Sequence, residues 1–344
     1  MHPLESTSPL AASSPCNEGD PWVVADAAHP DPAGGDPLAR LIGESHAAAL
    51  LRQRVVRAAG TRANVLIQGE SGTGKELVAR AIHALSDRAG RPLVVIQCGT
   101  IPDAIAASEL FGHERGAFTD ARAPRRGRFE AAHKGTLFLD EVGDLSPHVQ
   151  VHILRTIQFG EISRVGSDLT SHVDVRIIAA THRPLEAMAA DGRFRHDLYW
   201  RLNELPIRVP PLRDRPEDVP GLALRFLERA NASERRAVAG FSDRAMAALV
   251  EHPWPGNVRE LEHRVRRAVI EAANDELLEP PAFDLGPPEP ASGAPRLGAL
   301  LDETEAGLVT RALELCAGNR TRAAQILGVS RRTLQKKVAR YRLK

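Results

Sequence analysis

The chain has 344 residues and a formal net charge of +1, with 43% hydrophobic and 26% charged residues, which is ordinary usage for a globular protein of two or three domains. Its three cysteines, Cys16, Cys98 and Cys316, are odd in number and far apart, which argues against a disulfide framework or a zinc site and favours a reducing cytoplasm. No apolar run approaches about 18 residues, so we expect no membrane-spanning helix.

Residues 1–37 are rich in Pro, Ser, Ala, Gly and Asp and show no sustained period, which predicts a flexible arm. The arm lacks the basic-then-apolar order of a signal peptide, and we expect a cytoplasmic protein. It is also too short for a sensory domain. We therefore expect control to come from a separate regulatory protein.

From residue 38 to about residue 210, apolar strand patterns alternate with helical ones, which is typical of an α/β fold with a doubly wound parallel sheet. Helices are predicted over 76–85 and 150–158. The predicted strands are 65–68, 93–97, 137–140, 175–180 and 205–209.

Helical periodicity alone follows over residues 211–273, which predicts a small helical lid domain. Its helices are expected over 216–230, 242–251 and 256–273. Six prolines in 274–297 indicate a linker. Residues 298–344 form a last domain of short helices, and the nine Lys and Arg without any Asp or Glu between residues 318 and 344 favour a polyanionic partner.

A glycine-rich turn, GESGTGK at residues 69–75, lies between the first predicted strand and its helix. Glycines let backbone N–H groups approach phosphate oxygens, and the helix N-terminus adds partial positive charge. Lys75 would reach the β- and γ-phosphates of a nucleotide. Because Glu76 stands where a hydroxyl ligand for Mg²⁺ is usual, Asp140 would have to hold the metal, largely through water.

The strand at 137–140 ends in two carboxylates, Asp140 and Glu141. A solvated pair at a strand end is the simple interpretation, but with Lys75 upstream we predict that Asp140 positions Mg²⁺ and that Glu141 orients or deprotonates the attacking water. Hydrolysis also needs positive charge on the transition-state oxygens, often supplied across a subunit boundary. Arg195 and Arg201 are candidates, although spacing alone favours surface salt bridges for them.

Residues 110–121, LFGHERGAFTDA, place Phe118 and Thr119 at the expected tip of an exposed loop between the two halves of this site. A phosphate cradle, an acidic pair and a protruding apolar tip together indicate a motor that pushes on another molecule. His148 and His152 are four apart on a predicted helix, but no third ligand is evident, so we predict no metal site there.

The last domain has the pattern of a helix-turn-helix. Small Ala323 and Ala324 allow close helix crossing, Gly328 makes the turn and Ser330 caps the second helix, while Leu334 and Val338 face inward. The partner is predicted to be double-stranded DNA, bound by dimers at paired half-sites. We expect major-groove contacts from Arg331, Arg332, Gln335 and Lys336, and phosphate contacts from Lys337, Arg340, Arg342 and Lys344.

Seven segments stand in order along the chain: GESGTGKELVARAIH, ELFGHERGAFTDA, GTLFLDEVGDL, RVG, DVRIIAATH, GRFRHDLYWRLNELPIRVPPLRDRPEDV and WPGNVREL. Together they resemble the central AAA+ domain of bacterial enhancer-binding proteins, the sigma-54-dependent transcription activators, over about residues 38–272. GNRTRAAQILGVSRRTLQKKV extends the resemblance to a Fis-like DNA-binding end. The set of motifs is specific to this family, although no single one of them is.

The resemblance implies the role of each matching residue in an ATPase. Phe118 and Thr119 match the contacts to sigma-54, and residues 164–166 lie in a second surface loop that moves with the first. Arg195 and Arg201 match trans-acting arginine fingers, which places the active site between protomers of a ring. The ATP-binding set comprises Ile42 and Gly43 around adenine, the Walker A residues Gly69, Glu70, Ser71, Gly72, Thr73, Gly74 and Lys75, the adjacent Glu76, and the positions of Gln97, His182 and Arg259. Asp140 and Glu141 match the Walker B pair.

Three positions depart from the family pattern. Asp120 replaces the second glycine of the usual GAFTGA loop, which removes backbone freedom and adds a negative charge. His182 stands in place of the Asn of the first sensor, and its neutral ring donates only one N–H. Gln97 stands in place of the Asn that switches the catalytic glutamate, and its longer amide is expected to bond Glu141.

The predicted function is a sigma-54-dependent activator that binds upstream DNA and uses ATP hydrolysis in a ring to remodel the closed RNA polymerase complex. The alternative, motivated by the three departures, is a DNA-binding regulator on the same scaffold that does not remodel sigma-54 and acts with another sigma factor or as a repressor. A replication-initiator ATPase has similar parts, but the GAFT loop argues against it.

Overall fold

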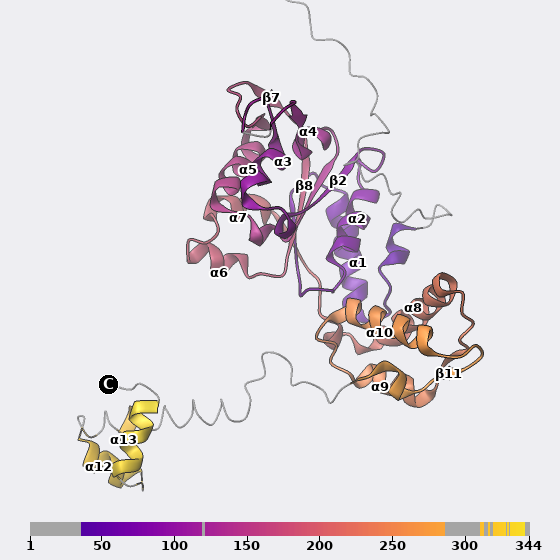
Figure 1. Cartoon of the computed structure of the whole chain (residues 1–344), viewed down its shortest axis with the longest axis vertical. Helices are drawn as coiled ribbons and strands as arrows, with labels where there is room; N and C mark the ends of the chain where they lie inside the picture. The colour runs from indigo at the N-terminus through magenta and orange to yellow at the C-terminus, as the bar shows by residue number, and fades with distance from the viewer. Residues whose placement is uncertain are drawn as a thin grey trace, which may run out of the picture. The chain divides into compact units, whose positions relative to one another are not determined.

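The computed structural model describes residues 36–118, 121–285, 310–312, 316, 319–327, 329 and 331–340. The chain divides into two compact units, residues 1–284 and 285–344, and each is described by itself (Figure 1). The predicted arm therefore lies outside the described residues except at its end, where Pro37 begins the 3₁₀ helix η2 (Pro37–Arg40).

Five parallel strands form the central sheet of the first unit, in the order β2-β5-β8-β1-β9. Their bounds are β1 (Val65–Gln68), β2 (Leu93–Gln97), β5 (Thr136–Asp140), β8 (Arg176–Thr181) and β9 (Leu205–Arg208). The predicted α/β fold is confirmed, and every predicted strand is present to within a residue at each end.

Alternate side chains of each strand enter different cores on the two faces of the sheet. Leu137 and Leu139 pack in one core, whereas Phe138 between them packs in the other. Helices α1 (His46–Ala59) and α2 (Lys75–Ala84) cover the Phe138 face (Figure 1). Helices α3 (Asp103–Phe111), α5 (Pro147–Phe159) and α7 (His196–Leu202) cover the opposite face (Figure 1). A sheet buried on both faces explains why its strands are continuous apolar runs.

The remaining elements of this unit surround the sheet. The helices are α3 (Asp103–Phe111), α4 (Arg128–Ala131), α5 (Pro147–Phe159), α6 (Leu185–Ala190) and α7 (His196–Leu202), with 3₁₀ turns η3 (Cys98–Thr100) and η4 (Val142–Asp144). Two antiparallel ribbons pair β3 (Gly112–His113) with β4 (Arg125–Arg126) and β6 (Glu161–Ser163) with β7 (Thr170–His172).

The helical lid follows β9 as predicted. It contains η5 (Leu212–Asp214), η6 (Pro216–Asp218), α8 (Val219–Glu234), α9 (Asp243–Glu251) and α10 (Asn257–Glu271). Ser242 caps α9 by accepting the Ala245 N–H at 3.1 Å. Fully buried Trp254 donates its indole N–H to the Leu249 carbonyl at 2.8 Å, which fixes the turn between α9 and α10.

Residues 274–284, which composition assigns to the linker, are folded onto the lid. β10 (Gly240–Phe241) pairs with β11 (Leu277–Leu278), and η7 (Pro280–Phe283) follows. Phe283 is only 2% exposed, and its ring stacks on Phe241 with centroids 5.8 Å apart. The prolines here begin a 3₁₀ turn, and the buried aromatic outweighs the polar composition.

The second unit contains α12 (Arg320–Ile326) and α13 (Arg331–Arg340). Its core includes Ala323, Ala324, Leu334 and Val338, as the helix-turn-helix pattern predicts. Asn319 caps α12 by accepting the N–H groups of residues 321 and 322. The predicted turn and cap, Gly328 and Ser330, lie outside the described residues. Among the helices that the structure describes, none has the length and apolar character needed to span a membrane.

Replacing Phe283 by Ala is expected to destabilise the lid by about 3–5 kcal/mol, because it leaves a cavity at a buried aromatic contact. The measurement is the urea midpoint of the full chain, followed by tryptophan fluorescence, since Trp254 is fully buried in the lid. Phe159→Ala is the matched control, because that ring is 65% exposed. Equal midpoints for the two variants would show that residues 280–283 are not part of the lid core.

Candidate active site

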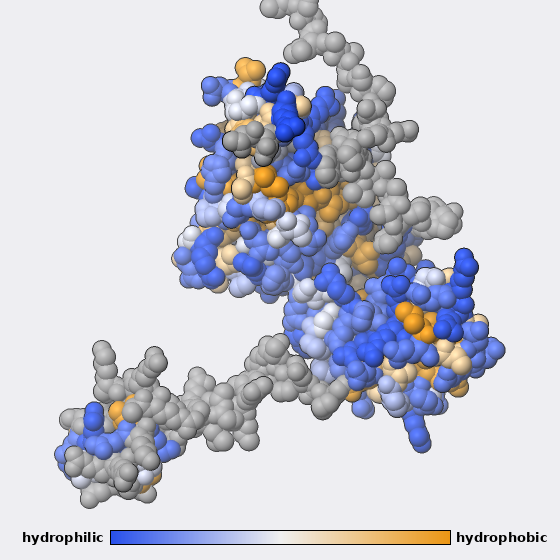
Figure 2. Space-filling view, viewed as in Figure 1, coloured by the Kyte–Doolittle hydropathy of each residue, from blue (hydrophilic) through white to orange (hydrophobic). Residues whose placement is uncertain are grey.

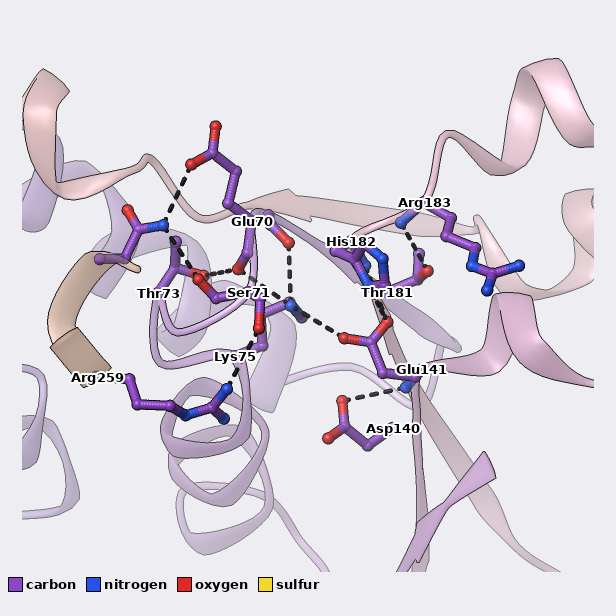
Figure 3. A network of polar contacts seen from close by, with 12 residues as sticks. Glu70, Ser71, Thr73, Lys75, Asp140, Glu141, Thr181, His182, Arg183 and Arg259 are labelled. Carbon is purple, nitrogen blue, oxygen red and sulfur yellow. Dashed lines mark hydrogen bonds and ion pairs between the residues drawn. The ribbon is translucent and has the colours of Figure 1, made fainter. Parts of the chain in front are cut away.

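The phosphate loop, residues 69–75, follows β1 and opens α2 at the carboxyl edge of the sheet (Figure 3). Gly72 and Gly74 have φ of 77° and 97°, which only glycine adopts without strain. The Lys75 side chain is buried, and its Nζ donates to the carbonyl oxygens of Gly69 and Glu70 at 3.0 and 3.1 Å. The loop therefore points a lysine ammonium group into its own turn.

The acidic pair lies at the same edge, at the end of β5. The Asp140 Oδ1 atom accepts the Glu141 N–H at 3.1 Å. Burial, followed by the neighbouring charge of Glu141, raises the pKa of Asp140 above its ordinary value. Glu141 has a left-handed φ of 54°, and its Oε1 lies 3.5 Å from Lys75 Nζ. The structure thus brings the predicted lysine and the acidic pair together.

His182 is the hydrogen-bonding partner of Glu141. The Glu141 Oε2 atom accepts the backbone N–H of His182 at 3.1 Å and its ring Nδ1–H at 2.7 Å (Figure 3). Burial alone would raise the pKa of Glu141, but these two hydrogen bonds and the charge of Lys75 bring it below its ordinary value.

The predicted bond from Gln97 to Glu141 is absent from the described part of the chain. Gln97 ends β2 opposite Asp140, but its side chain is exposed and makes no hydrogen bond with any described residue. Glu141 turns instead toward β8, where His182 follows Thr181. The sequence gives no signal for this choice, because β5 lies between β2 and β8 and both neighbours end near it.

The lid contacts the phosphate loop directly. Arg213 donates to both carboxylate oxygens of Glu70, at 2.6 and 2.8 Å, and this pairing lowers the pKa of Glu70. Buried Asn257 donates to Glu70 and to the Ser71 carbonyl at 3.1 and 3.0 Å. The predicted sensor residue Arg259 donates to Ser71 Oγ at 3.2 Å. Sequence reasoning missed Arg213 and Asn257; the left-handed φ of 54° at Asn257 is visible only in the structure.

The predicted adenine segment is connected to the phosphate loop through the lid. A Cβ on Gly43 would lie 2.6 Å from the Asp218 carboxylate, so no side chain fits there. Asp218 accepts the N–H and hydroxyl of Ser45 and lies 3.8 Å from Arg215, which donates to the Thr73 carbonyl. Ile42 and Gly43 line a cavity of about 1280 Å³ with residues of α1 and α8.

Glu76 and the histidine pair each contact a side chain of their own helix. Glu76 accepts two hydrogen bonds from Arg80, at 2.8 and 3.0 Å, one turn along α2. The rings of His148 and His152 are 4.8 Å apart, and burial lowers the pKa of His152. Within the described ranges, no group of three or more His, Cys, Asp or Glu side chains is arranged to hold a metal ion.

The candidate arginine fingers lie on the surface around α7. Arg195 donates to both oxygens of Asp197 at 3.0 and 2.7 Å, so it forms the salt bridge that its spacing suggests. Arg201 is exposed in the last turn of α7. Among the described residues, neither side chain bonds to the phosphate loop or to Asp140 and Glu141.

Two surface loops are joined to each other. The first covers residues 112–126 and the second residues 160–173. The Glu114 N–H donates to the Val165 carbonyl at 3.0 Å, and the Val165 N–H donates to the Gly112 carbonyl at 2.9 Å. Arg164 donates to Glu130 at 2.8 and 2.9 Å and to Glu114 at 2.9 Å. These hydrogen bonds, first of all those to Glu130, raise the pKa of Arg164.

The first loop carries Phe118, which is 40% exposed. Its ring packs against the ring of His113 in a T-shaped arrangement, with the two centroids 4.9 Å apart. His113 is in turn bonded to Ser108 Oγ at 2.7 Å. Thr119 and Asp120 lie outside the described residues.

On the face seen in Figure 2, the first unit is mostly hydrophilic, with apolar side chains in small separate groups. Sequence reasoning missed Glu114 and Glu130 as partners of Arg164.

Of the predicted DNA contacts, Gln335 is exposed and Lys337 is half-buried on α13. Arg331, Arg332, Lys336 and Arg340 also belong to α13, but their side chains lie outside the described part of the chain. Arg342 and Lys344 lie outside it entirely.

Three protein-family models match consecutive parts of the chain. The Sigma-54 interaction domain matches residues 41–208, and the AAA+ ATPase lid domain matches residues 213–284. The Fis family of bacterial regulatory proteins matches residues 300–341. These ranges correspond to the α/β sheet, to the lid including its folded end, and to the helix-turn-helix.

Known proteins show the same similarity over most of the chain. The chain is 49% identical to the transcriptional regulatory protein ZraR of Klebsiella oxytoca, over 87% of this chain and 68% of the relative. It is 44% identical to the regulatory protein AtoC of Escherichia coli (strain K12), over 82% and 63%. A crystal structure of NtrX from Brucella abortus in complex with ATP superposes with a TM-score of 0.63 at 38% identity, over 87% and 68%. The chain therefore belongs to the sigma-54-dependent transcriptional activators, as a DNA-binding regulator with an AAA+ ATPase domain.

Proposed function

We propose that this activator cleaves ATP at a seam between protomers of a ring and transmits the change through its joined loops to sigma-54 RNA polymerase. The observation that carries the proposal is the contact of Lys75 with Glu141 at 3.5 Å, beneath a lid that also touches the phosphate loop. Lys75, the candidate base Glu141 and the lid residue Arg259 would therefore all lie close to the phosphates of a nucleotide in this loop. The similarity to a solved relative with bound ATP supports ATP as the nucleotide.

In this proposal, the phosphates take the place of the loop carbonyls as partners of Lys75. The backbone N–H groups of residues 69–74 would surround the phosphate oxygens, and Arg259 would approach them from the lid. Ile42 and Gly43 would pack around adenine. Glu141 would accept a proton from the water that attacks the γ-phosphorus, while the bond to the ADP oxygen breaks and that oxygen keeps the electron pair.

Mg²⁺ is proposed as the metal that accompanies ATP. Asp140 is the residue that would hold it, through water, because a nearby cation would offset the repulsion between Asp140 and Glu141 that contributes to the raised pKa of Asp140. When bound, the ion would neutralise phosphate charge. Glu76 would remain paired with Arg80 rather than serve as a ligand.

Replacing Lys75 by Ala is expected to lower sigma-54 open-complex formation at least about 100-fold, because the phosphates lose their principal cation. The measurement is open-complex formation on a sigma-54 promoter with its upstream site, with ATPase activity recorded in parallel. Wild-type protein that hydrolyses ATP but opens no such promoter would contradict the proposed function. The neighbouring Arg80→Ala variant, outside the loop, controls for loss of charge on α2.

A ring is proposed because Arg195 and Arg201 lie outside the site of their own chain. Across a seam, their guanidinium groups would approach the γ-phosphate of the adjacent protomer, where they would stabilise transition-state charge. Arg195 would have to exchange its Asp197 partner for that phosphate, so assembly and nucleotide binding would be coupled.

Mixing two inactive variants tests this seam. Arg201→Ala lacks the finger and Lys75→Ala lacks the phosphate contact, so each alone should be nearly inactive. Randomly mixed rings should recover activity at about a quarter of their seams, where an intact phosphate loop meets an intact finger. The measurement is the ATPase rate of the mixture against each variant alone. No recovery in mixed assemblies of confirmed size would place the arginines outside the active site.

The two loops are proposed to act as one unit, with Phe118 and Thr119 as the contact to sigma-54. Arg164→Ala should leave the ATPase rate within about threefold of wild type but reduce open-complex formation about tenfold or more. The second loop would lose three charge-assisted hydrogen bonds, one to Glu114 of the first loop and two to Glu130 of α4. Arg122→Ala, an exposed arginine of the first loop, is the matched control. Equal loss of both activities in Arg164→Ala would indicate a role in the site itself.

The helix-turn-helix is proposed to hold the activator on upstream DNA in the cytoplasm. Arg331, Arg332, Gln335 and Lys336 would read bases, and Lys337 and Arg340 would contact phosphates. A separate regulatory protein is proposed to control assembly.

A further inference from the structure

We infer that His182 is a positioning residue for Glu141, and that it performs in this chain the orienting role expected of the amide at Gln97. It holds Oε2 of the carboxylate, so that Oε1 becomes the oxygen that takes the proton from the attacking water. This inference rests on the proposed ATP hydrolysis and adds the group that aims its base.

The two oxygens of Glu141 have different kinds of partner. Oε2 accepts two hydrogen bonds from one residue, at 3.1 Å from the backbone N–H and at 2.7 Å from the ring Nδ1 of His182. Among the described residues, the polar partner of Oε1 is the ammonium group of Lys75, at 3.5 Å. His182, the partner of Oε2, follows a strand of the central sheet. Lys75, the partner of Oε1, is the residue that the phosphates of a nucleotide would attract.

Nucleotide binding would therefore act on one oxygen only. Lys75 at present donates to the carbonyls of Gly69 and Glu70 and stands near Oε1. When it turns to the phosphates, Oε1 loses its cationic neighbour and can accept a proton, while His182 still fixes the plane of the carboxylate. The base becomes available when the substrate is in place.

The end of β8 is held firmly enough to serve as this anchor. Arg183 pairs with Asp144 at 2.5 Å, and its N–H donates to Thr181 Oγ1 at 3.0 Å. A Cβ on Gly143 would lie 3.2 Å from the side chains of both Thr181 and Arg183, which shows how closely β8 approaches the segment after Glu141. His182 consequently lies between two residues, Thr181 and Arg183, whose side chains are both in contact with neighbouring groups.

Sheet order explains why the role can move from one strand to another. β5, which carries Asp140, lies between β2 and β8; Gln97 is the last residue of β2, and His182 directly follows β8. Gln97 is exposed, and none of the described residues accepts or donates a hydrogen bond to its side chain. The His182 imidazole instead bonds the Glu141 carboxylate from the β8 side of β5, opposite to the side on which Gln97 lies.

The test measures kcat and KM for ATP in the full-length protein with His182→Ala, His182→Asn and Gln97→Ala. His182→Ala should lower kcat about 10- to 100-fold, since general-base catalysis depends on the aim of the base, and should leave KM within about twofold. His182→Asn should recover most of the rate, because its amide supplies an N–H donor. Gln97→Ala should lower kcat less than His182→Ala does, because the exposed Gln97 side chain makes no hydrogen bond with a described residue.

A double-variant cycle separates positioning from general structure. In the Glu141→Gln background, His182→Ala should cause no further loss of kcat, because there is no carboxylate base left to aim. An additive loss in the double variant would overturn the inference, as would an unchanged kcat in His182→Ala or a larger loss in Gln97→Ala. A raised KM with normal kcat would instead assign His182 to phosphate binding and would also overturn it.

The outcome for His182 is distinguishable from that of the proposed function. If wild-type protein hydrolyses no ATP with its DNA and polymerase present, the proposed function itself fails. If wild type is active and only the predicted pattern among the four variants is missing, the positioning role alone fails. His182 has a 44% exposed side chain, so its substitutions should fold, and thermal unfolding of each variant verifies this.

Discussion

A buried ammonium group must be surrounded by acceptors, and Lys75 meets that requirement with acceptors whose place the phosphates of a nucleotide would take. Its partners are two carbonyls of the phosphate loop and, at a longer distance, Glu141. Hydrogen bonds to a charged group contribute about 1.5–3 kcal/mol each, so exchange of these partners for phosphate oxygens is a substantial local rearrangement. The loop, the acidic pair and the lid all respond to the position of this one side chain.

The lid is coupled to that rearrangement through Glu70. One of its carboxylate oxygens accepts from both Arg213 and Asn257, and Asn257 also accepts the Leu212 N–H at 2.8 Å. A Cβ on Gly72 would lie 2.3 Å from the Gly256 carbonyl, so the loop and the start of α10 are in close contact. Any change in the path of the phosphate loop must therefore move the lid or break these bonds. That is how a ligand at the sheet edge can alter the relation between two subdomains.

Sequence reasoning predicts the sheet well and the details of the site less well, for physical reasons. Strands buried on both faces are uninterrupted apolar runs, as Val65–Gln68 illustrates, and the glycines and lysine of the phosphate loop are specific to phosphate binding. Residues 274–284 are harder, because one buried ring, that of Phe283, outweighs a proline-rich composition. The choice of His182 over Gln97 depends on strand order and side-chain reach, which no local pattern encodes.

The connection from the site to the two loops follows from the order of elements along the chain. α3 follows β2 and leads into the first loop, while α5 follows Glu141 and η4 and leads into the second. Each loop is thus carried by a helix that starts near the sheet edge, and Phe111 of α3 contacts His152 of α5 with ring centroids 5.4 Å apart. Arg164 then joins the loops through Glu114. Because packed helices move as rigid elements, a small displacement beside Glu141 would reach Phe118 through both helices at once.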